Sequence, residues 1–306
     1  MTSIICAGSI ALDTIRTPLR TVERVLGGAA SFFSLSASFF APVSLLGVVG
    51  SDFPPGYLQR LSGRKGIDAS GVVRSREKSP FFDMSFDHSL HTRTVNASEL
   101  NCLASYVPEV PKRLGQKNSL LYLATMPPAH QLRILKQAAK NRLCVMDTIS
   151  YYIENDVEDL KKTVSAVDGI VLNDAEARML SQEGNLLKAG RKILAMGPRF
   201  LAIKKGEHGS LLFFNGAVYP FPAFPLYDVV DPTGAGDSFA GGLMGFLAKK
   251  QATRERLRLK DLRQAMACAT VMGSFAVEDF SVARLESITA KDITKRYGEL
   301  ESAVHW

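Results

Sequence analysis

Short apolar runs alternate along this chain with segments of helical periodicity. The runs are dense in Val, Ile and Leu instead of alternating with polar residues, which is typical of strands covered on both faces. Strands are predicted at Ile4–Ala7, Val43–Val48, Ser119–Ala124, Leu143–Asp147, Gly169–Leu172 and Phe200–Ile203. Helices are predicted between them, at Ala29–Phe40, Ala129–Asn141, Val157–Val164, Asp174–Ser181 and Leu186–Met196. This order favours an α/β fold with a doubly wound, mostly parallel central sheet.

Two segments, approximately 14–26 and 72–105, interrupt this order. The first has no helical period, and the second is rich in Phe, Thr and Val. Doubly wound sheets bind ligands beyond the carboxyl ends of their strands, so a small β-element there is predicted to act as a lid. We therefore expect a single α/β domain over residues 1–306 that contains a small β lid. An exposed lid can also pair with a second copy, which leaves a homodimer open.

The composition is that of an ordinary globular protein, with 46% hydrophobic and 22% charged residues in a chain of 306. No apolar run reaches the ~18 residues that a membrane span needs. The first residues lack a basic stretch and reach Asp13 early, which argues against a secretion signal. The four cysteines are far apart and lack metal-ligand spacing, as expected of buried free thiols in a reducing cytoplasm. We expect a cytoplasmic protein without a membrane partner.

The formal net charge is +7, and Lys249–Arg263 alone holds seven basic and two acidic residues. Such a segment can bind nucleic acid. No aromatic residue is interleaved with these charges, however. We therefore interpret the segment as a solvated connection between two helices and expect no nucleic-acid partner.

The stretch Asp231–Gly242, DPTGAGDSFAGG, precedes an apolar helical pattern. The first amides of a helix lack internal partners and lie at the positive end of its dipole. Glycines let a ligand approach these amides, which suits a phosphate. Asp237, in the first turn, is placed to accept a proton from an attacking hydroxyl. The plain alternative is a helix cap with an aspartate stabilised by the dipole.

The stretch resembles the C-terminal signature of the ribokinase-like (PfkB) carbohydrate kinases, and the resemblance covers nearly the whole chain. Its other parts are a first strand ending in Asp13, a Gly-Gly turn, a G-x-x-G-x-D motif, an N-x-x-E motif and a glycine-containing turn near the nucleotide. They correspond to Ile5–Asp13, Leu26–Ala30, Gly47–Asp52, Asn173–Glu176 and Lys205–Gly209.

Members of this family transfer the γ-phosphoryl group of ATP to a hydroxyl of a small sugar or related polyol. The resemblance implies that Asp237 is the base. It also implies that the amides of Gly234, Ala235 and Gly236 stabilise the transition state. The nucleotide-binding residues that it implies are Asn173, Lys205, Gly206, Gly209, Thr233, Gly234 and Gly236.

The resemblance further implies Mg²⁺ at Asn173 and Glu176, held through water because Mg²⁺ keeps much of its hydration shell. Residues three apart share one face of a helix, so both side chains can approach one ion. Taken alone, N-x-x-E is also a helix capping box. Many family members bind a monovalent cation such as K⁺ near the anion hole, and Asp231 and the Thr233 carbonyl are the candidates here.

On the acceptor side, the resemblance implies contacts from Asp13 and from the Gly27-Gly28 turn. A carboxylate accepts two hydroxyl hydrogen bonds, which suits a diol. Several sugar kinases carry a substrate-binding asparagine where this chain has Phe32. Ser31 would then substitute as a donor, or Phe32 would close an apolar wall. Polar lid residues are further candidate contacts: Asp87, His88, His91, Arg93 and Asn96.

The sequence leaves the acceptor open. A small sugar or polyol is the leading interpretation, and a nucleoside or myo-inositol is the alternative within the family. A non-catalytic nucleotide- or sugar-binding regulatory protein is the alternative from another class. A nicotinamide-dependent dehydrogenase is disfavoured, because Gly8–Leu12 lacks the second and third glycines of the dinucleotide fingerprint.

Overall fold

The computed structural model describes residues 2–90, 92–115, 119–138 and 142–304. Its main feature is a nine-stranded sheet with the order β13-β12-β11-β10-β9-β8-β1-β4-β5. The strands from β11 to β5 are parallel, and β12 and β13 complete one edge in antiparallel pairing. The bounds are β1 Ser3–Ala7, β4 Val43–Val49, β5 Ile67–Arg74, β8 Ser119–Leu123, β9 Cys144–Asp147, β10 Gly169–Asn173, β11 Phe200–Lys204, β12 Ser210–Phe214 and β13 Ala217–Phe221.

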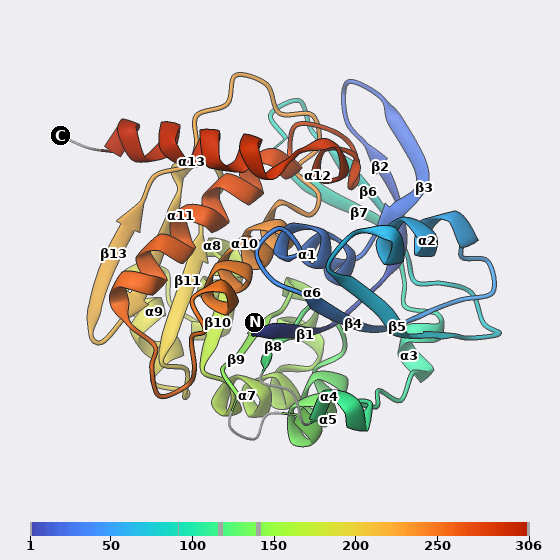
Figure 1. The fold of residues 1–306 in the computed structure, drawn as a ribbon, viewed down its shortest axis with the longest axis horizontal. Coiled ribbons are helices and arrows are strands. Elements are labelled where there is room, and N and C mark those ends of the chain that lie inside the picture. Colours follow the sequence, from blue (N-terminus) through green and yellow to red (C-terminus); the bar gives the residue numbers. More distant parts are fainter. Residues whose placement is uncertain (1, 91, 116–118, 139–141, 305–306) are drawn as a thin grey trace.

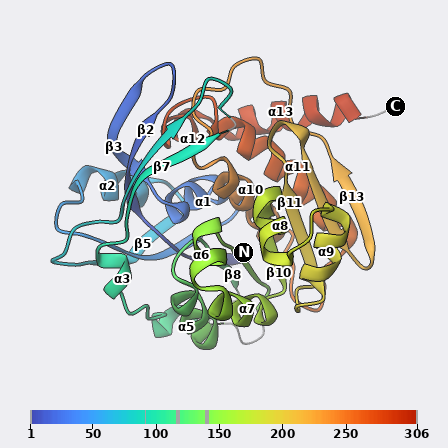
Figure 2. The same ribbon diagram turned by 180° about the vertical axis from the view of Figure 1, so that it is seen from behind.

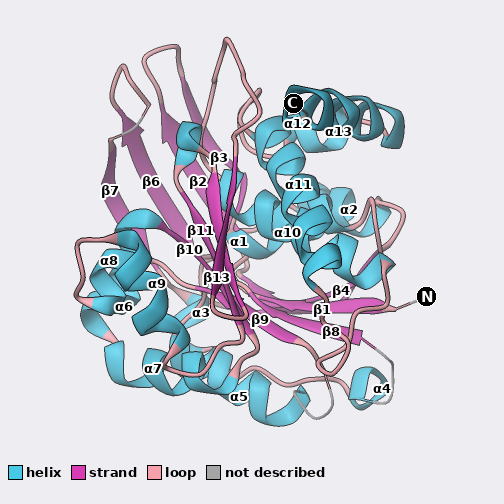
Figure 3. Cartoon of the chain, turned by 90° about the vertical axis from the view of Figure 1, so that its left-hand side faces the viewer, coloured by secondary structure: helices cyan, strands magenta, loops and turns pink. Residues whose placement is uncertain are grey.

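A second sheet of four strands has the order β3-β2-β6-β7. Its strands are β2 Ala11–Arg16, β3 Thr21–Gly27, β6 Phe81–Phe86 and β7 Arg93–Glu99. It follows directly from β1, and Figure 3 shows it beyond the end of β1 that lies away from the N-terminus. Ile15, Met84 and Phe280 form a small apolar cluster beneath it. Phe280 comes from the loop after α11, so this loop packs against the small sheet.

Helices cover both faces of the large sheet. One face carries α1, α2 and α10 to α13 (Figure 1), and the other carries α5 to α9 (Figure 2). The helices on the first face are α1 Ala29–Ala37, α2 Pro55–Gly63, α10 Ala235–Lys249, α11 Leu259–Ala276, α12 Ala283–Ser287 and α13 Ala290–Val304. The remaining helices are α3 Cys102–Ser105, α4 Lys112–Gly115, α5 Pro128–Ala138, α6 Ser150–Asn155, α7 Val157–Ala166, α8 Asp174–Ser181, α9 Leu186–Leu194 and the 3₁₀ turn η1 Gly206–His208.

The predicted fold class is confirmed, and each predicted strand and helix corresponds to an element of the large sheet or its helical layers. Strands β1, β8 and β9 are buried on both faces, which explains their unbroken apolar sequences. The predicted helix Ala129–Asn141 is described only to Ala138, because residues 139–141 lie outside the described residues. The basic segment Lys249–Arg263 was predicted to connect two helices. The connection is shorter than that segment, because α10 ends at Lys249 and α11 begins at Leu259.

All four cysteines are buried and unpaired. Among the described residues, no helix combines the length and the apolar character that crossing a membrane would require.

Candidate functional site

Three polar residues end neighbouring strands of the large sheet: Asp147 ends β9, Asn173 ends β10 and Lys204 ends β11. Because the three strands are parallel neighbours, these residues all lie at the carboxyl end of the sheet. The N-terminus of α10 lies at this same end, since Lys204 contacts the position of Gly236. The structure therefore brings the glycine-rich stretch onto the strand ends.

The first turn of α10 is an open helix N-terminus. Gly234 caps the helix with φ of +76°, a conformation that favours glycine, and a Cβ there would overlap the ring of Phe32. The Ala235 amide bonds to the Pro232 carbonyl at 3.3 Å. Within the described part of the chain, the amides of Gly234 and Gly236 have no such partner. Two of the three amides predicted to form the anion hole are thus free to bind an anion.

Helix α10 is held tightly by its neighbours. A Cβ on Gly241 would approach the Phe33 carbonyl of α1, and one on Gly242 would approach the Cys268 carbonyl of α11, at 2.6 Å and 2.7 Å. The Ser36 hydroxyl of α1 donates to the Ser238 carbonyl at 2.7 Å. These two glycines serve helix packing, which fixes the direction of the α10 N-terminus.

Asp237 is half-buried in the first turn of α10. Burial raises the pKa of its carboxyl, while the charges of Lys204 and Arg93 act to lower it. Arg93 belongs to β7 of the small sheet. Asp237 is therefore within electrostatic reach of a cation from the large sheet and another from the small sheet.

Asp13 lies on β2 of the small sheet and is 3% exposed. Its carboxylate packs on Gly27, where a Cβ would overlap Oδ2, and its Oδ1 accepts no hydrogen bond from the described residues. Burial raises the pKa of Asp13 to about 7, and the charges of Asp231 and Asp237 contribute to this rise. The Gly28 amide bonds to this carboxylate. The remaining unsatisfied oxygen is suited to accept a hydroxyl group of a ligand.

The Gly-Gly turn links the small sheet to α1. Gly28 has φ of +88°, and a Cβ there would approach the Ser9 carbonyl to 2.5 Å. Ser31 is fully buried in α1, where its hydroxyl donates to the Gly27 carbonyl at 2.8 Å. The Ser31 hydroxyl thus already has a partner in the turn before α1, and its contact with a substrate stays a prediction. Phe32 is also buried and supports Gly234.

Asn173 and Glu176 form a capping box at the start of α8. The Glu176 amide donates to Asn173 Oδ1 at 2.7 Å, and the Asn173 amide donates to Glu176 Oε2 at 2.8 Å. Burial raises the pKa of Glu176, and Lys204 and Arg93 act to lower it. Among the described residues Glu176 Oε1 accepts no hydrogen bond, so one oxygen is left to face a hydrated cation.

Asp231 is fully buried, and both of its carboxylate oxygens are occupied by backbone amides. Oδ1 accepts from Thr233 at 2.8 Å and Oδ2 accepts from Ser281 at 3.2 Å. The Ser281 hydroxyl donates to the Leu26 carbonyl of β3. Asp231 therefore ties the anion-hole turn to the loop under the small sheet. Its role with Thr233 at a monovalent cation stays a prediction.

The turn after β11 brings Lys205, Gly206 and Gly209 to the carboxyl end of that strand. The Lys205 amide donates to the Gly209 carbonyl at 2.8 Å, and both glycines have positive φ. A Cβ on Gly209 would overlap the Phe221 carbonyl of β13. The turn is therefore a closed structure next to Lys204.

The polar lid residues differ in what they face. Arg93 acts on Asp237 and Glu176, as its effect on both pKa values shows. Asn96 instead donates to Asp83 and Ser85 within the small sheet. His91 lies outside the described residues. Asp87 and His88 lie at the turn between β6 and β7.

Sequence reasoning missed Asp147 and Lys204. Asp147 accepts hydrogen bonds from the Tyr122 hydroxyl at 2.7 Å and the Thr125 hydroxyl at 2.9 Å. Burial raises its pKa, and so does the charge of Asp237. Each residue ends an apolar strand of the large sheet. Asp13 was predicted to end the first strand, but β1 ends at Ala7 and Asp13 lies within β2 of the small sheet.

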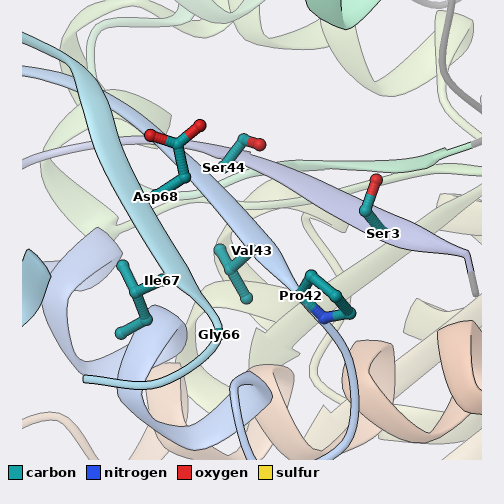
Figure 4. Close-up of a pocket in the computed structure, with 7 residues that line it drawn as sticks. All are labelled: Ser3, Pro42, Val43, Ser44, Gly66, Ile67 and Asp68. Carbon is teal, nitrogen blue, oxygen red and sulfur yellow. The ribbon is translucent and has the colours of Figure 1, made fainter. Parts of the chain in front are cut away.

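A separate pocket of about 280 Å³ lies at the amino end of the large sheet, opposite to the carboxyl ends of the strands (Figure 4). Ser3, Val43 and Ile67, at the amino ends of β1, β4 and β5, line it together with Asp68. It is remote from the strand ends that carry Asp147, Asn173 and Lys204, and ligands of such sheets bind at the carboxyl ends.

Comparisons with known proteins all find similarity to kinases that act on small molecules. The model of the pfkB family carbohydrate kinases matches residues 1–288. A cytidine kinase of Thermococcus kodakarensis is 30% identical over 268 residues, covering 85% of this chain and 93% of the relative. The nucleoside kinase of Burkholderia thailandensis, solved with inosine, superposes with a TM-score of 0.76 at 20% identity, over 98% of this chain and 99% of the other. The aminoimidazole riboside kinase of Salmonella enterica, solved with its riboside and an ATP analogue, has a TM-score of 0.74 at 17% identity, over 97% and 100%.

Proposed function

The chain belongs to the pfkB family of carbohydrate kinases, and on this premise we propose that it transfers the γ-phosphoryl group of ATP to a hydroxyl of a nucleoside. The observation that carries the chemistry is the open N-terminus of α10, which has Asp237 in its first turn and free amides at Gly234 and Gly236. Asp13 is buried within electrostatic reach of Asp237. The acceptor class rests on the relatives, which are named for cytidine, nucleosides and a riboside. A nucleoside was the alternative in the sequence analysis, and it replaces a free sugar as the leading acceptor.

Each residue of the site has a distinct part in this proposal. Asp13 accepts hydrogen bonds from two hydroxyls of the ribose and so orients the acceptor. Asp237 takes the proton of the attacking hydroxyl as its oxygen bonds to the γ-phosphorus. The bond from the γ-phosphorus to the bridging oxygen breaks, and its electron pair leaves with ADP. The free amides of Gly234 and Gly236 stabilise the charge on the transferred group.

Mg²⁺ fits the donor set in kind, because Glu176 offers a free carboxylate oxygen and Asn173 lies beside it. The two residues would hold the ion through water, since their other oxygens cap α8. The ion would neutralise phosphate charge when bound. Lys205, Gly206, Gly209 and Thr233 stay predicted nucleotide contacts.

The direct test is a turnover assay with MgATP and a panel of acceptors. Cytidine, inosine and adenosine are compared with ribose, fructose and myo-inositol. We expect kcat/KM for the best nucleoside to exceed that for every free sugar and cyclitol by about 100-fold, because a bound nucleobase adds about 3 kcal/mol of contacts. A sugar that outperforms all nucleosides would restore the sugar-kinase interpretation. Binding without turnover across the panel would favour a regulatory protein.

Gly27→Ala should damage acceptor binding without unfolding the protein. The new Cβ would overlap Oδ2 of Asp13, so the carboxylate must turn away from the acceptor. We expect the acceptor KM to rise at least ~10-fold, the loss of about one hydrogen bond to a charged group, while ATP affinity measured by calorimetry stays unchanged. Gly184→Ala is the matched control, because its Cβ would enter open space. An unchanged acceptor KM would show that Asp13 does not contact the acceptor.

A further inference from the structure

Lys204 is the last residue of β11, and its side chain lies along the first turn of α10. Its Nζ is 2.5 Å from the position that a Cβ on Gly236 would occupy. The missing side chain of Gly236 therefore makes room for the ammonium. The amide of Gly236 is one of the two free amides of the anion hole.

Three carboxylates from three elements lie within electrostatic reach of this ammonium. The positive charge of Lys204 lowers the pKa values of Asp147, Glu176 and Asp237 against the opposing effect of burial. Within the described part of the chain, none of them comes within the 4.0 Å of an ion pair with Lys204. The ammonium is thus attracted to the site and bound to no single partner there.

Asp147 has hydrogen bonds to both of its carboxylate oxygens. It is 5% exposed and receives the Tyr122 and Thr125 hydroxyls. The Phe33 ring stacks on Tyr122 with centroids 4.0 Å apart, and the Gln131 side chain donates to the Asp147 carbonyl at 3.0 Å. Asp147 is therefore a carboxyl group held in one orientation at the end of β9, with its oxygens already occupied by hydroxyl groups, and the charge of Lys204 favours its ionised form.

We propose that the Lys204 ammonium contacts the phosphoryl group during transfer, beside the amides of Gly234 and Gly236, and that Asp147 is the positioning residue that holds the ammonium there. This inference rests on the proposed phosphoryl transfer. Lys204 keeps its proton throughout, and its contribution is electrostatic, because the transferred group carries its largest charge on the oxygens that the ammonium faces. Asp147 touches neither substrate and acts through Lys204.

The first test is Lys204→Met. We expect kcat to fall about 100-fold, the usual loss when one donor is removed from an oxyanion hole, with the acceptor Kd unchanged. Lys204→Arg should recover part of kcat, since it keeps the charge. Gly236→Ala should also lower kcat, because the new Cβ displaces the Lys204 ammonium. The Gly236 amide and the lysine itself are both retained in this variant. Lys188→Met, which removes an exposed lysine of α9, is the control and should match the wild type.

A second measurement separates this inference from the proposed function. Together with Mg²⁺ and ADP, aluminium fluoride mimics the transition state of phosphoryl transfer, and no acceptor is needed. The wild type should bind this mixture more tightly than Mg²⁺ and ADP alone, and Lys204→Met should lose that difference. If no acceptor is phosphorylated, the proposed function fails while this measurement still decides the role of Lys204. A kcat for Lys204→Met within threefold of the wild type, or an intact fluoride effect, would overturn the inference.

The role of Asp147 is tested by a double-mutant cycle. We expect Asp147→Asn to lower kcat by about tenfold and to leave the acceptor KM unchanged. In a Lys204→Met background the same change should have no further effect, because Asp147 acts only through the ammonium. If the fall in kcat of the double variant equals the product of the two single falls, Asp147 has a separate structural role.

Discussion

Asp237→Asn should abolish most phosphoryl transfer while leaving nucleotide binding intact. We expect kcat to fall about 10³- to 10⁴-fold, because general-base catalysis typically contributes up to 10⁴. Asparagine has the same shape, so the first turn of α10 and its free amides stay in place. The ATP affinity measured by calorimetry should therefore change by less than about threefold. Thermal stability should not fall, since the variant removes a buried charge that opposes ionisation of Asp147.

A matched control exists on α7. Asp159 is the third residue of that helix, as Asp237 is the third of α10, and its side chain is 44% exposed and paired with Lys162. Asp159→Asn should leave kcat unchanged. Turnover of Asp237→Asn near the wild-type rate would remove Asp237 as the base and leave it as a helix-capping residue.

Asp13→Asn should weaken acceptor binding and, at the same time, stabilise the protein at alkaline pH. Asparagine replaces a carboxylate that accepts two hydroxyl hydrogen bonds, and hydrogen bonds to charged groups contribute about 1.5–3 kcal/mol each. We therefore expect the acceptor KM to rise about 100-fold. Kinetics with the best acceptor of the panel measure this effect.

The stability change follows from the pKa of Asp13, which burial raises from 3.8 to about 7. A carboxyl group with a raised pKa in the folded state favours the protonated form there. The free energy of unfolding thus decreases as pH rises from about 4 to 7 and stays low above that range. Asparagine removes this cost, so the variant should gain up to ~4 kcal/mol at pH 8 and less at pH 5. Denaturant unfolding at both pH values measures the gain.

In the wild type, kcat/KM for the acceptor should fall as pH decreases below about 7, because a protonated Asp13 accepts fewer hydroxyl groups. A variant that is less stable than the wild type at pH 8 would contradict the assignment of Asp13 as a strained binding carboxylate. It would indicate instead a carboxylate that supports the small sheet.

The large sheet and the glycine-rich stretch were predictable because their signals are local. An apolar run such as Ser119–Leu123 is buried wherever it is placed in a parallel sheet. The turn before α10 needs glycine at position 234 for its positive φ, and this requirement belongs to the turn itself. The hairpin at Asn215 and Gly216 is local in the same sense, and both residues have positive φ.

The orientations of the Ser31 and Lys204 side chains could not be predicted from neighbouring residues in the sequence. Ser31 follows the Gly-Gly turn, so its hydroxyl was a reasonable donor, but the packing of α1 turns it toward the Gly27 carbonyl. Lys204 was passed over for Lys205, its neighbour in the next turn. Only the pairing of β11 with β10 and the approach of α10 place the Lys204 ammonium against the position of Gly236.

By itself, then, the sequence determined the α/β class, the order of its elements, the glycine-rich helix start and the family. Periodicity, turn conformation and the chemistry of a motif are properties of consecutive residues, so they can be read without coordinates. The tertiary structure decided which separate carboxylates and cations lie within electrostatic reach of one another: Asp13, Asp147, Glu176, Asp237, Lys204 and Arg93. Their electrostatic coupling depends on distance and burial, and both arise only when strands and helices far apart in the chain pack together.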